Sequence, residues 1–218
     1  MRRRRRGTLN RCVTAAAENV SVMRKPADSS APLADLIAER WSPRALDETG
    51  EVTWDQLRAM LEAARWAPSF GNTQPARFLV GRRGDDTFER ILTTLTTRNQ
   101  SWARRAGALL VAVMVTRNEK GEIPYAEYGL GLASQNLVLQ AVSEGLVAHQ
   151  MAGFDADAVR REFDIPDEAT PRVAIAVGVQ AAAEILGEER DVSREQAERR
   201  RMPLPEFAFT GTWGKAAF

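Results

Sequence analysis

Cysteine and histidine are almost absent from this chain of 218 residues, which contains only Cys12 and His149. A single cysteine excludes a disulfide within the chain, and one cysteine with one histidine cannot build a Cys/His zinc site. A Ser-His-Asp triad would have to use His149, because there is no second histidine. Most catalytic sites built on a metal or on a catalytic triad are therefore excluded. If the protein is an enzyme, we expect its reactivity to come from an organic cofactor.

Long apolar runs are also lacking. No stretch approaches the length of a membrane span, so we expect no membrane partner. The segment after the arginine-rich start, residues 8–23, contains polar and charged residues where a signal peptide is apolar (Asn10, Arg11, Glu18 and Asn19). These features predict a cytoplasmic protein, and the length is enough for one domain with a sizeable core.

Charge is balanced in sum but unevenly placed. The chain has 30 Lys+Arg and 29 Asp+Glu, a net charge of +1, and residues 2–6 with Arg11 supply six of the positive charges. Subtracting these six from +1 leaves −5 for the rest, so we expect no nucleic-acid partner for the body. Residues 1–30 are predicted to be a disordered basic extension, or to include an upstream start with Met23 as the first residue. An arm that binds an anionic partner is the alternative.

Patterns of helix and strand are interleaved without strict alternation or repeats. Apolar periodicity and turn signals predict helices after Pro32, from Thr53 to Pro68, and over 86–97, 125–146, 155–163 and 193–199, with strands over 77–81, 108–115 and 173–179. The helix expected at 125–146 is apolar nearly all round, which indicates burial in a core or at a subunit interface. Residues 31–218 are therefore expected to form an α+β domain with helices wrapped round one sheet.

The first candidate constellation is Arg40-x-Ser42-x-Arg44. Pro43 disfavours helix at Ser42, and in an extended segment Arg40, Ser42 and Arg44 share one side. Two guanidinium groups and a hydroxyl would make a good phosphate clamp. A solvated basic turn is the alternative.

The second is the loop 68–75, with Ser69, Asn72 and Gln74. Its amide side chains offer paired donors and acceptors that suit a flavin's pyrimidine edge or ribityl hydroxyls, and Gly71 permits close approach. Such residues are also common in ordinary helix-to-strand connections.

The third is the run of arginines at 199–201. Pro203 favours extended backbone nearby, which places Arg199 and Arg201 on one side. A charge run of this kind is more often a solvated face.

The fourth is the stretch His149 to Gly153, expected to be a short turn that aims backbone N–H groups at a ligand. His149 could be a general base, although a lone histidine after a buried helix is more often structural.

Taken in order, these pieces resemble the nitroreductase family of FMN enzymes over about residues 33–214. The matching elements are Arg40-x-Ser42-x-Arg44, Ala67-Pro68-Ser69, Asn72-x-Gln74-Pro75 with Arg77-Phe78, Asn99-x-x-Trp102, Gln135-Asn136-Leu137 in the family's long interface helix, and Arg199-x-Arg201-x-Pro203. No single element is specific, and their shared order and spacing carry the resemblance.

The resemblance implies a nitroreductase-like fold, with a central, mostly antiparallel sheet wrapped by helices in an intertwined homodimer. It implies FMN as cofactor and NADH or NADPH as reductant, with ping-pong transfer of hydride to an electron-poor small molecule such as a nitroaromatic or quinone. No catalytic side chain and no metal ligand are implied. The implied cofactor-binding residues are Arg40, Trp41, Ser42, Arg44, Arg199 and Arg201, then Pro68, Ser69 and Asn72 from the partner subunit, and Gln150, Met151, Ala152 and Gly153 near the flavin N5 and O4.

Two features depart from the family pattern. An Asp that one branch often carries near Gly129 is absent, and the basic residue usual beneath the flavin's pyrimidine edge could be Arg104 or Arg105. Two alternatives stay open. One is an FMN enzyme of the same fold with another reaction, such as a dehalogenase or dehydrogenase, and the other is a non-catalytic flavin-binding protein.

Overall fold

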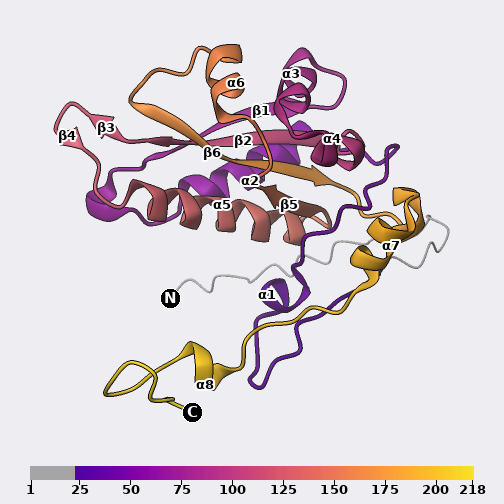
Figure 1. Cartoon of the computed structure of the whole chain (residues 1–218). Helices are drawn as coiled ribbons and strands as arrows, with labels where there is room; N and C mark the ends of the chain where they lie inside the picture. Colours follow the sequence, from indigo (N-terminus) through magenta and orange to yellow (C-terminus); the bar gives the residue numbers. More distant parts are fainter. Residues whose placement is uncertain (1–22) are drawn as a thin grey trace, which may run out of the picture.

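One antiparallel sheet lies at the centre of the molecule (Figure 1). The computed structural model describes residues 23–218, and the predicted arm at residues 2–6 lies outside them. The four strands run in the order β1-β2-β6-β5, and every neighbouring pair is antiparallel. Their bounds are β1 Ala76–Arg82, β2 Ala108–Val115, β5 Val147–Met151 and β6 Ala169–Gly178. This arrangement confirms the predicted α+β fold and its antiparallel sheet.

Helices cover both faces of the sheet, and β2 is buried between them. Helices α2 (Trp54–Arg65) and α5 (Ala126–Ser143) pack on one face, together with Leu110 of β2. Helices α3 (Asp86–Thr94), α4 (Thr97–Ala103) and α6 (Ala156–Glu162) pack on the other face, with Leu109 and Val111. Since successive strand residues point to opposite faces, a strand covered on both faces has to be apolar at every position. The continuous apolar run at 108–115 is this strand, as predicted.

Local capping signals set the starts of two helices. Thr53 and Gln56 form a capping box at the start of α2, in which Gln56 N donates to Thr53 Oγ1 over 3.2 Å and Thr53 N donates to Gln56 Oε1 over 3.0 Å. Asp155 caps α6 by accepting a hydrogen bond from Ala158 N at 2.9 Å. Both caps lie at the first residues of helices predicted from sequence, and each satisfies backbone N–H groups that the first turn leaves free.

The helix predicted over 86–97 is wrong in extent, because it is interrupted at Leu95. There the backbone is extended, and Leu95 forms an isolated bridge with Phe154. The next N–H group, that of Thr96, donates to Gly153 O at 3.0 Å. These contacts with a distant segment replace the hydrogen bonds that would have continued the helix, and α4 begins only at Thr97.

The turn predicted at His149 to Gly153 is also wrong over most of its length. Residues up to Met151 belong to β5, with His149 opposite Ala176 of β6. Only Ala152 and Gly153 leave the strand. Pairing with β6 supplies the strand's hydrogen bonds, a long-range contact that five residues of mixed polarity do not reveal.

The remaining elements are short and lie around this core. They are α1 (Asp35–Glu39), η1 (Phe70–Asn72), the hairpin β3 (Arg117–Asn118) and β4 (Gly121–Glu122), η2 (Ala183–Leu186), α7 (Glu189–Gln196) and α8 (Leu204–Phe207). Helix α7 therefore begins and ends earlier than the helix predicted over 193–199. In the described residues, no helix is both long and apolar enough to cross a membrane.

The two ends of the described chain differ in how they are attached to the rest of the fold. Residues 23–27, part of the predicted extension, are hydrogen-bonded to the body: Gln180 Nε2 donates to Met23 O at 2.9 Å, and Ala27 N donates to Ala38 O at 2.8 Å. Residues 202–218, which we call the C-terminal arm, project away from the sheet (Figure 1). The arm exposes large apolar side chains, including Phe207 at 70%, Trp213 at 92% and Phe218 at 81%.

Candidate functional site

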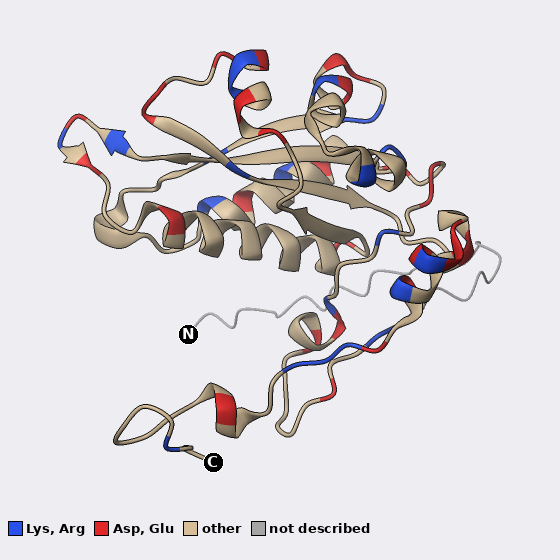
Figure 2. Ribbon diagram, in the orientation of Figure 1, with Lys and Arg blue, Asp and Glu red and all other residues tan. Residues whose placement is uncertain are grey.

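The chain leaving α7 carries basic residues where it passes the end of α1 (Figure 2). We call Arg40, Arg199 and Arg201 the arginine cluster. Burial, and then the charges of Arg199 and Arg201, lower the pKa of the Arg40 guanidinium from its usual value. Burial and the charge of Arg201 likewise lower the pKa of Arg199, opposed by Glu39. Glu39 is itself paired with Arg24 at 2.5 Å. The cluster thus holds more positive charge than its carboxylate neighbour can balance.

Hydrogen bonds fix two members of the cluster. Arg40 Nη1 donates to Ser42 Oγ at 3.1 Å, so these two predicted site residues are in direct contact. Arg199 Nη1 donates to two backbone oxygens, Lys25 O at 2.6 Å and Ala38 O at 2.8 Å. One edge of the Arg199 guanidinium is therefore occupied, and the group is held in a defined orientation. An oriented guanidinium binds an oxyanion at a lower entropic cost than a free one.

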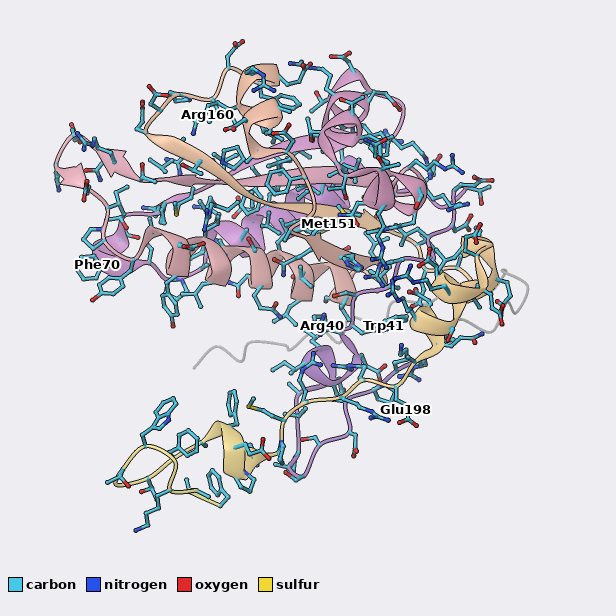
Figure 3. The ribbon with its side chains drawn as sticks, viewed as in Figure 1. Arg40, Trp41, Phe70, Met151, Arg160 and Glu198 are labelled. Carbon is cyan, nitrogen blue, oxygen red and sulfur yellow. The ribbon has the colours of Figure 1, made fainter. Side chains whose placement is uncertain are left out.

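A hollow of about 590 Å³ opens beside the predicted phosphate-binding segment and the end of β5. Figure 3 shows Met151, one of its lining residues, at the centre of the molecule, with Arg40 and Trp41 below it. The hollow is lined by Arg44, Thr96, Arg98, Asn99, His149, Gln150, Met151, Ala152, Gly153 and Arg194. The structure thus brings the predicted stretch 150–153 together with Arg44.

The bend after β5 is held by two donors on one carbonyl. Asn99 Nδ2 donates to Gly153 O at 2.9 Å, and Thr96 N donates to the same oxygen at 3.0 Å. A Cβ on Gly153 would lie 2.7 Å from Asn99 Nδ2, closer than real Cβ contacts allow. Glycine at 153 therefore permits the close approach that fixes this bend at the edge of the hollow.

His149 is positioned by the predicted phosphate-binding segment. Its Nδ1 lies 3.1 Å from Pro43 O, and since a carbonyl only accepts, Nδ1 carries the proton. Its ring packs against Trp102 in a tilted arrangement, with 4.8 Å between the ring centroids. Burial, and then the charge of Arg44, lower the pKa of His149 to about 4. A neutral ring with its Nδ1 proton committed to a carbonyl serves as a structural tie in this state.

The loop 68–75 lies elsewhere. Figure 3 shows Phe70 of this loop at the far left, well separated from Arg40 and Met151. Ser69 Oγ accepts a hydrogen bond from Gln74 N at 2.9 Å, while Pro68 and Asn72 are exposed. In the described part of the chain, no hydrogen bond or ion pair joins this loop to the hollow or the arginine cluster. One chain therefore assembles two of the predicted groups but leaves Pro68, Ser69 and Asn72 apart.

One of the two departures from the family pattern has a local explanation. A Cβ on Gly129 would lie 2.9 Å from the Pro75 ring, so α5 has no room for a side chain there against the loop. Arg104 is exposed and Arg105 Nη1 donates to Ser101 O at 3.3 Å. Neither lines the hollow.

Several residues at the site were not predicted. Lys25 Nζ lies 4.4 Å from the centre of the Trp41 ring and donates to Glu195 O at 2.7 Å. Glu195 is buried beneath the predicted phosphate-binding segment, and Arg98 and Arg194 line the hollow. Of these, only Arg98 had a sequence signal, since it precedes Asn99 of the Asn-x-x-Trp element.

Comparison with known proteins matches this geometry to one family. The model of the nitroreductase family matches residues 37–179. A crystal structure of an oxidoreductase containing FMN superposes with a TM-score of 0.79 at 30% identity, covering 85% of this chain and 95% of that one. A nitroreductase family protein from Clostridium difficile has the same fold, with a TM-score of 0.62 at 22% identity, covering 81% of this chain and 96% of that one.

The chain is also similar in sequence to several other proteins. An uncharacterized 15.4 kDa protein of Mycolicibacterium smegmatis is 36% identical over 146 residues, which are 63% of this chain and 97% of that protein. A Streptomyces coelicolor protein named as an NADH dehydrogenase/NAD(P)H nitroreductase is 28% identical over 150 residues, 58% of this chain and 74% of that protein. The match of the family model over most of the chain confirms the resemblance seen in the sequence, and the protein belongs to the nitroreductase family of oxidoreductases.

Proposed function

We propose that this protein binds FMN and transfers hydride from NADH or NADPH to an electron-poor small molecule, in two separate half-reactions. The observation that carries the proposal is the arginine cluster, whose Arg40 is bonded to Ser42 and lies near enough to His149, a lining residue of the 590 Å³ hollow, for its charge to help lower the pKa of that ring. Arg40, Arg199 and Arg201 crowd together with little compensating negative charge. A phosphate group relieves such repulsion, because its oxygens accept charge-assisted hydrogen bonds from several guanidinium groups at once. The FMN-containing structure at 30% identity supports FMN as the molecule that carries this phosphate.

Different residues of the site would bind different parts of the cofactor. The arginine cluster and Ser42 would bind the phosphate, with Trp41 and Arg44 beside them. The stretch 150–153 would place backbone groups against the flavin ring from within the hollow. When bound, FMN accepts hydride from the reductant and passes it on, so the protein's own contribution is binding, orientation and electrostatics.

His149 takes no part in proton transfer in this proposal. It is neutral at pH 7, since its pKa lies at about 4, and its Nδ1 is bonded to Pro43 O. Hydride transfer itself needs no general base, so the proposal does not require His149 to accept a proton. His149 instead ties β5 to the phosphate-binding segment.

The site is completed in our proposal by a second copy of the chain. Among the described residues, Pro68, Ser69 and Asn72 form no hydrogen bond with the arginine cluster of their own chain, and Figure 3 shows Phe70 of the same loop well apart from Arg40. The exposed apolar side chains of the C-terminal arm, together with Leu33, Leu36 and Ile37 beside and on α1, offer a surface for a partner. Several large exposed apolar side chains on one segment are typical of an interaction site. The partner's loop 68–75 would then reach the flavin.

Absorbance spectra and FMN titrations test the cofactor. We expect the purified protein to be yellow or to bind added FMN, and to oxidise NADH or NADPH when an acceptor such as menadione is present. The double variant Arg40→Ala/Arg201→Ala should lose FMN, whereas the exposed control Arg117→Ala should keep it. Parallel double-reciprocal plots would support the two half-reactions. A protein that neither contains nor retains FMN would contradict the proposal.

A further inference from the structure

Two arginines from different helices meet at the edge of the hollow. Arg98 belongs to α4 and Arg194 to α7, and both line the space beside the stretch 150–153. Between them lies Asp191: its Oδ1 is 3.9 Å from Arg98 Nη2 and 4.0 Å from Arg194 Nη1. One carboxylate thus faces two guanidinium groups, each at the outer limit of an ion pair.

This edge of the hollow carries an excess of positive charge. The lining residues include Arg44, Arg98 and Arg194 but no Asp or Glu. Asp191 can neutralise one of the two edge arginines but not both. All three groups reach solvent, with side-chain exposures of 59% for Arg98, 41% for Arg194 and 33% for Asp191. Long, solvent-exposed ion pairs are weak, so an incoming anion can displace Asp191 from between the two arginines.

The phosphate of the proposed cofactor does not account for these arginines. This phosphate is assigned to the arginine cluster, a separate group formed by Arg40, Arg199 and Arg201. Arg98 and Arg194 face the same hollow as the stretch 150–153, where the substrates of the proposed reaction have to enter. A negatively charged substrate group near this entrance would find two guanidinium groups that form bidentate bonds with planar or tetrahedral oxyanions.

We infer that Arg98 and Arg194 form a docking site for an oxyanion carried by a substrate that exchanges at the hollow, with Asp191 as the weakly paired carboxylate that the oxyanion displaces. The inference rests on the proposed function, because it assigns the charge of that reaction's substrates. The oxyanion has two possible sources. It is a phosphate of NADH or NADPH, or a carboxylate or sulfonate of the electron acceptor.

Steady-state kinetics of four variants test the site. Arg98→Ala and Arg194→Ala each remove one guanidinium, Asp191→Asn removes the competing charge, and Arg190→Ala is the control. Arg190 is exposed on the same helix and is not part of the hollow. KM and kcat are measured for NADH, NADPH, 3,5-dinitrobenzoate and the neutral 3,5-dinitrobenzamide, with the second substrate saturating and FMN content recorded for each variant.

The arginine variants should raise KM for the anionic substrate roughly tenfold, the effect of losing one hydrogen bond between charged groups, with kcat and FMN content unchanged. Asp191→Asn should lower the same KM, and Arg190→Ala should leave it unchanged. A change for NADPH alone assigns the 2′-phosphate, a change for both nicotinamides assigns the pyrophosphate, and a change for dinitrobenzoate but not dinitrobenzamide assigns the acceptor.

Two results would overturn the inference while leaving the proposed function intact. One is normal FMN binding with KM unchanged for all four substrates in both arginine variants. The other is a rise in KM for Asp191→Asn that matches the arginine variants, since a merely structural triad would suffer from the loss of any member. Failure of the wild-type protein to bind FMN would instead remove the proposed function, and this inference with it.

Discussion

Glu195 and Arg44 are joined through the main chain, because Glu195 Oε1 accepts the Arg44 N–H at 2.8 Å. The same oxygen accepts the Ala45 N–H at 3.0 Å. Glu195 is 2% exposed, and no other Asp, Glu, Lys or Arg in the described residues is classed as buried. A buried carboxyl group that serves two successive N–H groups fixes the direction in which the chain leaves Ser42 and Arg44. Helix α7 thereby sets the shape of the predicted phosphate-binding segment.

Two substitutions of Glu195 distinguish the loss of its hydrogen bonds from other effects of replacing the side chain. Glu195→Ala leaves two N–H groups without their acceptor and should destabilise the fold by roughly 2–4 kcal/mol. Glu195→Gln keeps an oxygen at the same place and should retain most of the stability and any FMN affinity. Urea denaturation and FMN titration measure both, with the exposed Glu198→Ala as control. Equal losses in the Ala and Gln variants would show that the two N–H bonds are not the reason for the burial of Glu195.

His149 should make stability depend on pH. Its pKa is 6.5 in the unfolded chain and about 4 in the folded one, first because of burial and then because of Arg44. Between these values the unfolded chain binds more protons, so the free energy of unfolding should fall as pH drops from about 6.5 to about 4. The loss should reach up to about 3 kcal/mol.

The comparison with His149→Gln isolates this contribution. Other groups titrate equally in both proteins. The difference between the unfolding free energies of wild type and His149→Gln should therefore shrink as pH falls from about 7 to about 4. Chemical denaturation at several pH values gives the difference. A gap that stays constant across the range would mean that His149 titrates alike in the folded and unfolded chains.

Gly129 should tolerate no side chain. An added Cβ would meet Pro75 Cγ at 2.9 Å and Ser69 Cβ at 3.7 Å, and a proline ring cannot move aside easily. Gly129→Ala should therefore cost about 1–3 kcal/mol and displace the loop 68–75. Ser134→Ala on the same helix is the contrasting variant, because its buried hydroxyl has no hydrogen-bond partner among the described residues and its loss should be neutral or stabilising. Thermal denaturation compares the two, and a G129A protein as stable as wild type would contradict the packing argument.

The C-terminal arm should decide the oligomeric state. Replacing Phe207, Trp213 and Phe218 with serine keeps Arg199 and Arg201 but removes the exposed aromatic surface, and buried aromatic anchors contribute about 2 kcal/mol or more each at interfaces. We expect the triple variant to be monomeric by light scattering and to bind FMN more weakly than wild type. Lys215→Ser, in the same arm, is the control. Wild-type protein that is monomeric at micromolar concentration would refute the proposed dimer.

Sequence predicted the parts of this fold that depend on neighbouring residues. The capping box at Thr53 and the cap at Asp155 are local, and the two-sided burial of β2 shows in its unbroken apolar run. Strand β5 was missed because its partner is distant, with His149 opposite Ala176. The break between α3 and α4 was missed for the same reason, since the Thr96 N–H is taken by Gly153 O.

The site shows the same division. Arg40 and Arg199 lie far apart in sequence, and only the resemblance to a family suggested that they meet. Glu195 sits in a polar stretch that predicts a solvated helix face, and nothing nearby in the chain signals that the segment at Arg44 covers it. Arg98 and Arg194 come from different helices, so their convergence on Asp191 depends on how α4 and α7 are placed by the rest of the fold.

The separation of the loop 68–75 from the arginine cluster determines which of the two sites in a mixed dimer is affected by a substitution. In the proposed dimer, each site takes its arginines from one chain and Asn72 from the other. A mixed pair of one Arg40→Ala chain and one Asn72→Ala chain would carry one doubly damaged site and one fully intact site. Placing both substitutions on a single chain, paired with a wild-type chain, would damage both sites. Two defective proteins could therefore restore each other's activity, while one defective chain could impair a healthy partner.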